Sequence, residues 1–507
     1  MSTVPMRRAG IAGWCLLVFV ATAWLHTRHN DFPWYYHPDE PGKVEQVMGT
    51  RPWNFHHPML LLSATKLAVT VSGVKSEQAV AETGRTVSAL FTAGAVVVMV
   101  LIAMLARGWG AGVITGLALM LHHQLFELSH YMKEDPALLF GLSLTFLAGF
   151  VFEKWPSPAA AAMMGLACGI AISGKYLGFI ALAVPVIVLT RSGIKGAWPV
   201  LIFVLLATFA AVNLPLLGDW ERFSASFARE SRLVVEGQGE ITQRVPHSRY
   251  WSIFLANSTP VMWVLILVAV SAAIRRRALL SAMEWTTLGF PFAFAIALSF
   301  SPKDNDRYFL PATAMFTLLA VAGISYLADL LRARFRPRWT EAIAGLALVA
   351  AQFPSWTDDR GGLVRYVGAF QHDDTAELVE WLRANVPLPA MLAKDEKVRL
   401  PTPLRHGESV ATSVLPHRIL SDAYAADLGS FEELQARGVT HVITTPSTYQ
   451  KFERAGFRPK QGQEDLYTRR KLFYAALRRD FDDPVWMRKR GTVIYLHPGL
   501  EVYRIAK

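Results

Sequence analysis

Long apolar runs recur through the first two thirds of this sequence and constrain its fold more than any other feature. A helix needs about 20 mainly apolar residues to cross a lipid bilayer. Such runs predict a polytopic α-helical membrane protein with about 11 transmembrane helices. The expected spans are 10–25, 86–106, 110–127, 136–152, 158–173, 176–190, 197–216, 258–274, 281–299, 308–328 and 340–354.

The density of charged residues divides the chain into two parts. Charged side chains make up about 14% of residues 1–354 and about 28% of residues 355–507, and the second value is typical of soluble domains. We therefore expect a transmembrane domain over 1–354, with long external loops at 26–85 and 217–257. A soluble α/β domain is expected over 355–507.

The soluble part has recognisable local signals. A helix is expected over 375–385, with its N-terminal cap at Thr375 and its end set by Pro387. A second helix over 431–437 leads into a strand over 439–444. The segments 493–496 and 502–505 flank His497-Pro498-Gly499, which predicts a hairpin between them.

Basic residues in the loops indicate the orientation in the membrane. With the N-terminus in the cytoplasm, the inner loops hold 13 basic and 4 acidic residues, as the positive-inside rule requires. An odd number of spans then places the C-terminal domain outside the cytoplasm. A further span at 58–74, which contains Lys66, would move Arg275–Arg277 to the outer side. We therefore expect 58–74 to be a helix lying in the outer interface.

Net charge and cysteine content exclude two other classes. The formal net charge is +11, but the excess lies largely in short loops between apolar runs, which argues against nucleic acid as a partner. Cys15 and Cys168 both lie in apolar runs, so no disulfide framework is expected.

Ionisable residues beside a membrane are costly and are therefore functional candidates. On the predicted topology they gather at the outer helix ends, where carboxylates and cations from distant parts of the sequence would meet. The candidates are Asp39, Glu40 and His57 in the first external loop, Glu134 and Asp135 at the start of a span, Lys175 and Tyr176 at an outer turn, Arg249 in the second long loop, and Arg307 and Tyr308 at the start of another span.

Five of these short motifs occur in an order typical of a known group. They are Asp39-Glu40, His57-Pro58, Glu134-Asp135-Pro136, Gly174-Lys175-Tyr176 and Arg307-Tyr308-x-Leu-Pro. With this order, the chain resembles the GT-C superfamily of integral-membrane glycosyltransferases. It is similar to the group of protein O-mannosyltransferases and lipid A aminoarabinose transferases.

The resemblance implies an enzyme of the hexosyl- or pentosyl-transferring type. It would move a sugar from a polyprenyl-phosphate donor to a lipid, glycan or protein acceptor outside the cytoplasm, with inversion at the anomeric carbon. Asp39 is then the general base and Asp135 the second acidic position. Lys175, Arg307 and, from its place in the loop, Arg249 would neutralise the departing phosphate. The remaining expected substrate-binding residues are Glu40, His57, Glu134, Tyr176 and Tyr308.

Structural roles remain open for several of these residues. Asp135 before Pro136 is also a good helix start, Lys175 could extend to lipid headgroups, and Tyr308 could anchor the helix at the interface. His37, His56 and His57 form no standard metal-ligand motif, so no metal site is predicted and a divalent cation is left open as a cofactor.

Other functions and the cellular location were also weighed. The chief alternative is a secondary transporter or lipid flippase, but the sequence has no internal repeat. A non-catalytic membrane scaffold is the third possibility. The resemblance implies a bacterial cytoplasmic (inner) membrane protein with membrane lipids around it. The absence of a long soluble insertion between spans leaves the nature of the acceptor open.

Overall fold

The structure is a computed structural model, in which the chain forms two compact units. It describes residues 3–236, 242–244, 249–277, 280–300, 305–335, 339–354, 362–401, 407–453, 457–481 and 483–506. The first unit comprises Met1–Val235 and His247–Val364, and the second comprises Glu236–Pro246 and Arg365–Lys507. A short piece of the expected loop 217–257 therefore belongs to the same unit as the C-terminal part.

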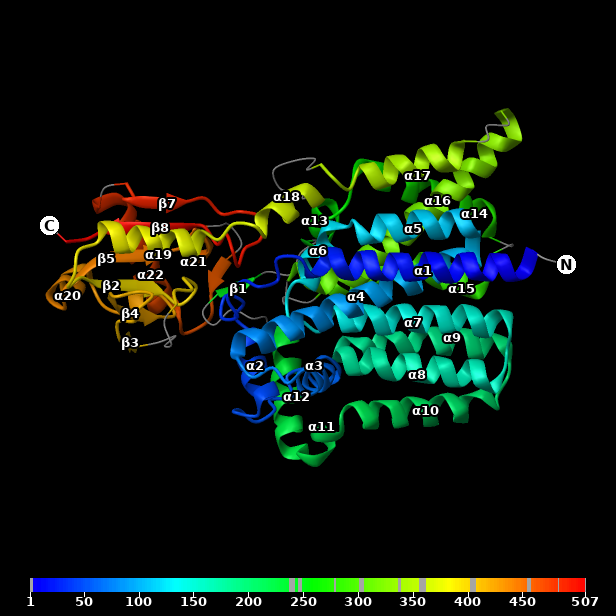
Figure 1. Ribbon diagram of the computed structural model, residues 1–507, viewed down its shortest axis with the longest axis horizontal. Coiled ribbons are helices and arrows are strands. Elements are labelled where there is room, and N and C mark those ends of the chain that lie inside the picture. The colour runs from blue at the N-terminus through cyan, green and yellow to red at the C-terminus, as the bar shows by residue number, and fades with distance from the viewer. Residues whose placement is uncertain are drawn as a thin grey trace. The chain divides into compact units, whose positions relative to one another are not determined.

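The described part of the first unit is helical (Figure 1). Its N-terminal half contains α1 (Thr3–Thr27), α2 (Glu40–Met48), α3 (Leu60–Ser72), α4 (Glu77–Arg107), α5 (Trp109–Met120), α6 (His123–Ser129), α7 (Asp135–Lys154) and α8 (Pro158–Gly174). After these come η1 (Tyr176–Leu182), α9 (Ala183–Ser192), α10 (Ala197–Val212), α11 (Leu214–Gly218), α12 (Trp220–Glu236), α13 (Arg249–Ala256), α14 (Pro260–Arg275), α15 (Ala282–Ser299), η3 (Asp306–Phe309), α16 (Leu310–Phe335) and α17 (Thr340–Ala350).

Each apolar run expected from the sequence is helical over most of its length, but 110–127 is divided between α5 and α6, 197–216 is divided between α10 and α11, and 176–190 begins as the turn η1. Among the described residues, four helical stretches are long and apolar enough to cross a membrane: Ala9–Thr27, Glu77–Arg107, Asp135–Lys154 and Asp306–Leu331. Most of the other expected spans are apolar helices of 10–17 residues. The chain is thus a multi-pass helical protein by length and composition, while the count of eleven stays a prediction. The segment expected to lie in the interface forms the helix α3.

Small residues let the helices of the first unit approach closely. A Cβ atom at Gly141 of α7 would lie 2.4 Å from the Cα of Ala171 in α8, and one at Gly323 of α16 would lie 2.0 Å from the carbonyl oxygen of Leu265 in α14. Such backbone contacts are typical of helices that associate in membranes. Helix α8 packs against α7 and also against α10 (Figure 1).

The second unit is built on a six-stranded sheet with the order β3-β4-β2-β5-β8-β7. Strands β4, β2 and β5 run parallel, and the others are antiparallel to their neighbours. The sheet contains β2 (Met391–Asp395), β3 (Gly407–Ser409), β4 (Arg418–Asp422), β5 (Val439–Thr444), β7 (Trp486–Arg488) and β8 (Leu500–Arg504). A separate antiparallel pair joins β1 (Thr242–Arg244) to β6 (Phe457–Pro459).

Alternating side chains of the sheet form two apolar cores, one on each face. Leu392 of β2 packs with Leu378 on one face, and the next residue, Ala393, packs with Tyr474 on the other. The helices of this unit are α18 (Leu363–Ala369), which begins at the unit boundary, α19 (Asp374–Asn385), α20 (Phe431–Ala436), α21 (Pro446–Tyr449) and α22 (Glu464–Asp480), with short turns η4 (Ala425–Asp427) and η5 (Gln450–Phe452).

Two local expectations for this unit were wrong. The helix expected over 375–385 is capped by Asp373, whose carboxylate accepts the N–H groups of Thr375 and Ala376, and not by Thr375. Strand β8 has Trp486–Arg488 as its antiparallel neighbour, whereas 493–496 forms a turn. The expected helix before β5 and the strand itself are confirmed.

Candidate functional site

Five elements of the first unit bring charged side chains into one group, which we call the ionic cluster. Its members come from the start of α2, the segment before α7, the start of α7, the end of α8 and the turn η3. They are Asp39, Lys43, Lys133, Glu134, Asp135, Lys175 and Arg307. Four cations therefore face three carboxylates.

Asp39 presents its carboxylate to two cations of the cluster. It precedes α2, but its side chain makes no capping bond to the helix and is 44% exposed. It accepts a hydrogen bond from Lys133 Nζ and lies 3.5 Å from Arg307 Nη1. Burial alone would raise the pKa of Asp39, but Lys133, His37 and Arg307 outweigh it and hold that pKa well below its usual range. The carboxylate is therefore ionised.

The ammonium group of Lys133 has an unusual environment. Its side chain is 2% exposed, and burial, together with the neighbouring Arg307, lowers the pKa of Lys133 to about 7 despite the attraction of Asp39. Its backbone is fixed by the hydroxyl of Ser88 in α4, which accepts the Lys133 N–H at 3.2 Å. Lys133 can therefore change its charge near neutral pH.

Glu40 lies beside Asp39 in sequence but forms a different interaction. It is fully buried, and its two carboxylate oxygens accept hydrogen bonds from Arg85 of α4, at 3.1 Å from Nε and 2.6 Å from Nη2. Arg85 also donates to the carbonyl oxygens of Asn30 and Phe32. The structure thus places Glu40 where it fixes the segment that contains Asn30 and Phe32 on α4, away from the exposed carboxylate of Asp39.

Glu134 joins α2 to the start of α7. Its carboxylate lies 2.6 Å from Lys43 Nζ and 3.9 Å from His57 Nε2. Burial alone would raise the pKa of Glu134, but Lys43 and His57 together have the larger effect and lower it below its usual value. The carboxylate is therefore ionised. Burial lowers the pKa of His57 to about 4, so its imidazole is neutral at pH 7. Lys43 also donates to the carbonyl oxygen of Met132.

The second pair of the cluster joins two neighbouring helices. Asp135 Oδ1 accepts a hydrogen bond of 2.6 Å from Lys175 Nζ, and Asp135 Oδ2 lies 4.0 Å from Arg307 Nε. Lys175 ends α8 in an extended conformation and its Nζ lies 4.4 Å from the ring centroid of Tyr308. Close packing of α7 on α8 brings Asp135 and Lys175 together, although 40 residues separate them.

The hydroxyl of Tyr176 shapes the segment that carries the two histidines. It donates a hydrogen bond of 2.9 Å to the carbonyl oxygen of Phe55, which has a left-handed backbone with φ of 49°. A non-glycine residue rarely adopts that conformation unless its surroundings hold it there. Arg249 is the first residue of α13, and its side chain lies outside the described part of the structure.

A cavity of about 390 Å³ opens beside the ionic cluster. Its lining includes polar residues, namely His56, His57, Lys175, Tyr308, Glu230 and Ser231. It also includes apolar residues, namely Leu177, Phe179, Ile180, Phe294, Ala297 and Leu298. The cavity therefore suits a molecule with an anionic or polar head and an apolar tail.

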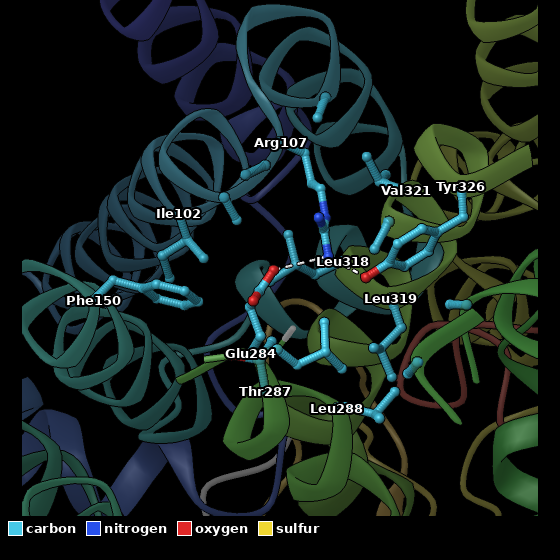
Figure 2. Close-up of a pocket in the computed structure, with 17 residues that line it drawn as sticks. Ile102, Arg107, Phe150, Glu284, Thr287, Leu288, Leu318, Leu319, Val321 and Tyr326 are labelled. Atoms are coloured by element: carbon cyan, nitrogen blue, oxygen red, sulfur yellow. Dashed lines mark hydrogen bonds and ion pairs between the residues drawn. The ribbon is translucent and has the colours of Figure 1, made fainter. Parts of the chain in front are cut away.

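A second, smaller cavity of about 60 Å³ is lined by Arg107, Glu284 and Tyr326 among other residues (Figure 2). Arg107, Glu284 and Tyr326 point toward one another there: Arg107 Nη2 lies 2.8 Å from the Glu284 carboxylate and donates to the Tyr326 hydroxyl. Arg107 and Arg85 are 22 residues apart on α4, which corresponds to about 33 Å along a helix. The two cavities are thus at opposite ends of the bundle.

Two charged residues of the site, Lys43 and Arg85, were not among the sequence candidates, and Lys133 was noted only as the first residue of the motif Lys133-Glu134-Asp135-Pro136. Lys43 follows Glu40 by three residues, a spacing that places both on one side of a helix. Lys133 directly precedes Glu134, and Arg85 lies just before an expected span. A cation at the outer end of an apolar run was the signal available for Arg85. Among the described residues, no three His, Cys, Asp or Glu side chains form a group that could hold a metal ion.

Comparison with known proteins gives one sequence match to a family. Residues 65–223 match the family of dolichyl-phosphate-mannose-protein mannosyltransferases. This segment runs from α3 to α12 and includes Lys133, Glu134, Asp135, Lys175 and Tyr176 of the site. No curated protein matches the sequence closely enough to count as a relative.

Solved structures share the fold over most of the chain. ArnT from Cupriavidus metallidurans in the apo state has a TM-score of 0.52 and 14% identity, covering 90% of this chain and 97% of ArnT. ArnT bound to undecaprenyl phosphate gives the same score and identity and covers 99% of each chain. The apo oligosaccharyltransferase of Archaeoglobus fulgidus has a TM-score of 0.51 and 14% identity, covering 94% of this chain and 80% of the enzyme.

Proposed function

We propose that this chain, a GT-C-fold relative of ArnT and the O-mannosyltransferases, is a membrane glycosyltransferase that takes its sugar from a polyprenyl-phosphate donor. The resemblance inferred from the short motifs is confirmed by these matches. ArnT has been solved with undecaprenyl phosphate, which supports a lipid-linked donor for this chain as well.

One observation carries the proposal: the ionic cluster lies beside an amphipathic cavity. Lys175 belongs to both, since it pairs with Asp135 and lines the cavity. Lys175 and Arg307 are cations of the cluster, and they suit the anionic phosphate of a polyprenyl donor. The apolar lining residues that η1 and α15 contribute suit the isoprenoid chain.

In the proposed reaction, the acceptor hydroxyl attacks the anomeric carbon of the sugar and gives its proton to Asp39. The bond between that carbon and the phosphate oxygen breaks, and the electron pair leaves with the lipid phosphate. Lys175 and Arg307 neutralise the charge that develops on the leaving phosphate. Attack from the face opposite the phosphate inverts the anomeric carbon.

Asp39 and Asp135 have separate roles in this proposal. Asp39 is the more accessible of the two, with 44% of its side chain exposed against 2% for Asp135. Asp39 therefore acts as the base, whereas Asp135 positions Lys175 and Arg307. When Arg307 turns toward the donor phosphate, Asp39 loses a counter-charge and its affinity for a proton rises.

The location and the chemical partners belong to the same proposal. We place the site on the outer side of a bacterial cytoplasmic membrane, with eleven spans and the second unit outside the cytoplasm. The donor sugar is a hexose or pentose, and the acceptor is a lipid, glycan or protein. No step is assigned to a divalent cation. Activity after chelation, with and without added Mg²⁺ or Mn²⁺, tests that assignment.

The test uses the purified protein in lipid nanodiscs with radiolabelled polyprenyl-phosphate sugars and an envelope extract as the source of acceptor. The proposal expects one donor to release free polyprenyl phosphate while its label enters an acceptor. In sealed proteoliposomes, label that crosses the membrane without a new glycosidic product would instead establish a transporter or flippase. If the protein shows neither transfer nor transport, the remaining interpretation is a non-catalytic membrane scaffold.

A further inference from the structure

Helix α12 closes one side of the cavity with a single face. Phe227, Glu230 and Ser231 all line the cavity, and their spacing of three and four residues places them side by side on the helix. Phe227 packs edge-on against Tyr176, with ring centroids 5.2 Å apart. The other two residues, Glu230 and Ser231, are polar, so α12 adds a carboxylate and a hydroxyl to a lining that also contains two imidazoles and a lysine.

The histidine segment opposite is held in place from two sides. Ser226 of α12 donates a hydrogen bond to the carbonyl oxygen of Asn54, and Tyr176 donates one to the carbonyl oxygen of Phe55. The strained backbone at Phe55 is therefore fixed by Tyr176, which lines the cavity, and by Ser226 on the helix that carries Phe227. This arrangement defines the direction of the next residue, His56.

His56 has hydrogen-bonding capacity that the described residues leave unused. Its Nδ1 atom is buried, and among the described residues it has no hydrogen-bond partner. Burial lowers the pKa of His56, while the nearby Glu230 carboxylate acts in the opposite direction. A neutral imidazole has one donor and one acceptor nitrogen, and a carboxylate accepts only. Together they match the donors and acceptors of adjacent sugar hydroxyls.

We propose that Glu230 and His56 bind hydroxyl groups of the donor's sugar and thereby determine which sugar the protein transfers. This inference rests on the proposed function. With the phosphate at Lys175 and the isoprenoid chain against the apolar residues of the lining, the polar side chains of Glu230 and His56 remain for the sugar. A buried polar group discriminates strongly, because an analogue that lacks the matching hydroxyl leaves it unpaired.

The experiment compares Glu230→Gln and His56→Phe with wild type in nanodiscs. Glu221→Gln is the matched control, since Glu221 lies on the same helix, is exposed and does not line the cavity. Two quantities are measured: kcat/KM for polyprenyl-phosphate sugars that differ at single hydroxyls, and the Kd of polyprenyl phosphate without a sugar. Circular dichroism and elution as a single species confirm that each variant is folded.

We expect Glu230→Gln and His56→Phe to lower kcat/KM for the preferred donor by about 10- to 100-fold. For donors that lack one hydroxyl, the two substitutions should lower kcat/KM less. The ratio of kcat/KM between the preferred donor and these donors should therefore decrease, while the Kd of polyprenyl phosphate without a sugar does not increase. Glu221→Gln should behave as wild type. An unchanged order of donor preference, or an equal loss for the bare lipid, would overturn the inference. If wild type itself uses no donor, the proposed function fails, and that result is seen without any variant.

Discussion

At the scale of single residues, adjacent carboxylates have opposite environments. Asp39 is partly exposed and faces Lys133 and Arg307, whereas Glu40 is fully buried and binds Arg85. The sequence shows two acidic residues in a loop and predicts both for the site. It could not separate them, because the partner of Glu40 lies 45 residues away on another helix.

The buried pair predicts a stability effect. Removing one partner of a buried ion pair typically costs about 3–5 kcal/mol, because the other charge is left without compensation. Glu40→Gln should therefore lower the thermal unfolding temperature of the detergent-solubilised protein strongly. Asp39→Asn is the control and should lower it much less, since that side chain is 44% exposed. Equal unfolding temperatures for the two variants would contradict the structural role of Glu40.

Lys133 predicts a pH dependence of turnover. Its pKa of about 7 means that it carries a charge below that pH and becomes neutral above it. Asp39 loses a counter-charge when Lys133 becomes neutral, so its affinity for the acceptor proton rises. We therefore expect kcat, measured with saturating donor, to increase as the pH rises through about 7.

The matched variant for this prediction is Lys133→Arg. A guanidinium keeps its charge throughout this range, so the rise in kcat near pH 7 should disappear. Measurement from pH 5.5 to 9 separates the cases. A rise of the same size at the same pH in Lys133→Arg would assign it to another group.

At the scale of elements, helix packing decides which residues meet. The apolar runs predicted the helices well, because length and hydropathy are local properties of the sequence. The contact of Asp135 with Lys175 follows from the approach of α7 to α8 at Gly141 and Ala171. A single sequence shows small residues in both runs but not which helices pair. The sequence likewise does not show which strands pair, so the antiparallel neighbour of β8, Trp486–Arg488, was not predicted.

The close approach of α7 and α8 predicts a second stability effect. Gly141→Ala places a Cβ atom 2.4 Å from the backbone of Ala171, so the helices must separate. Overpacking of this kind typically costs about 1–3 kcal/mol, and activity should fall with the unfolding temperature because Asp135 and Lys175 move apart. Gly289→Ala in α15 is the control, since a Cβ atom there meets nothing within 4 Å. Similar unfolding temperatures would argue against close packing at Gly141.

At the scale of the whole molecule, the sequence predicted a helical membrane part and an α/β part. The change in charge density carries that information, and the ArnT and oligosaccharyltransferase structures share the fold. Pairing between distant strands was not predictable. Thr242–Arg244 pairs with Phe457–Pro459 although more than 200 residues separate the two strands. The cavity was also missed, because it is lined by residues from five parts of the chain whose arrangement depends on the fold.

The central claim is that Asp39 takes the acceptor proton while a lipid phosphate leaves. The most direct test measures release of free polyprenyl phosphate from the preferred donor by wild type and Asp39→Asn in nanodiscs. The same samples are used to measure the Kd of the donor.

The account predicts that Asp39→Asn lowers kcat by about 10²- to 10⁴-fold, the usual range for loss of a general base. The Kd of the donor should stay close to that of wild type, since Lys175 is untouched and still pairs with Asp135. Full release by a correctly folded Asp39→Asn protein would contradict the account.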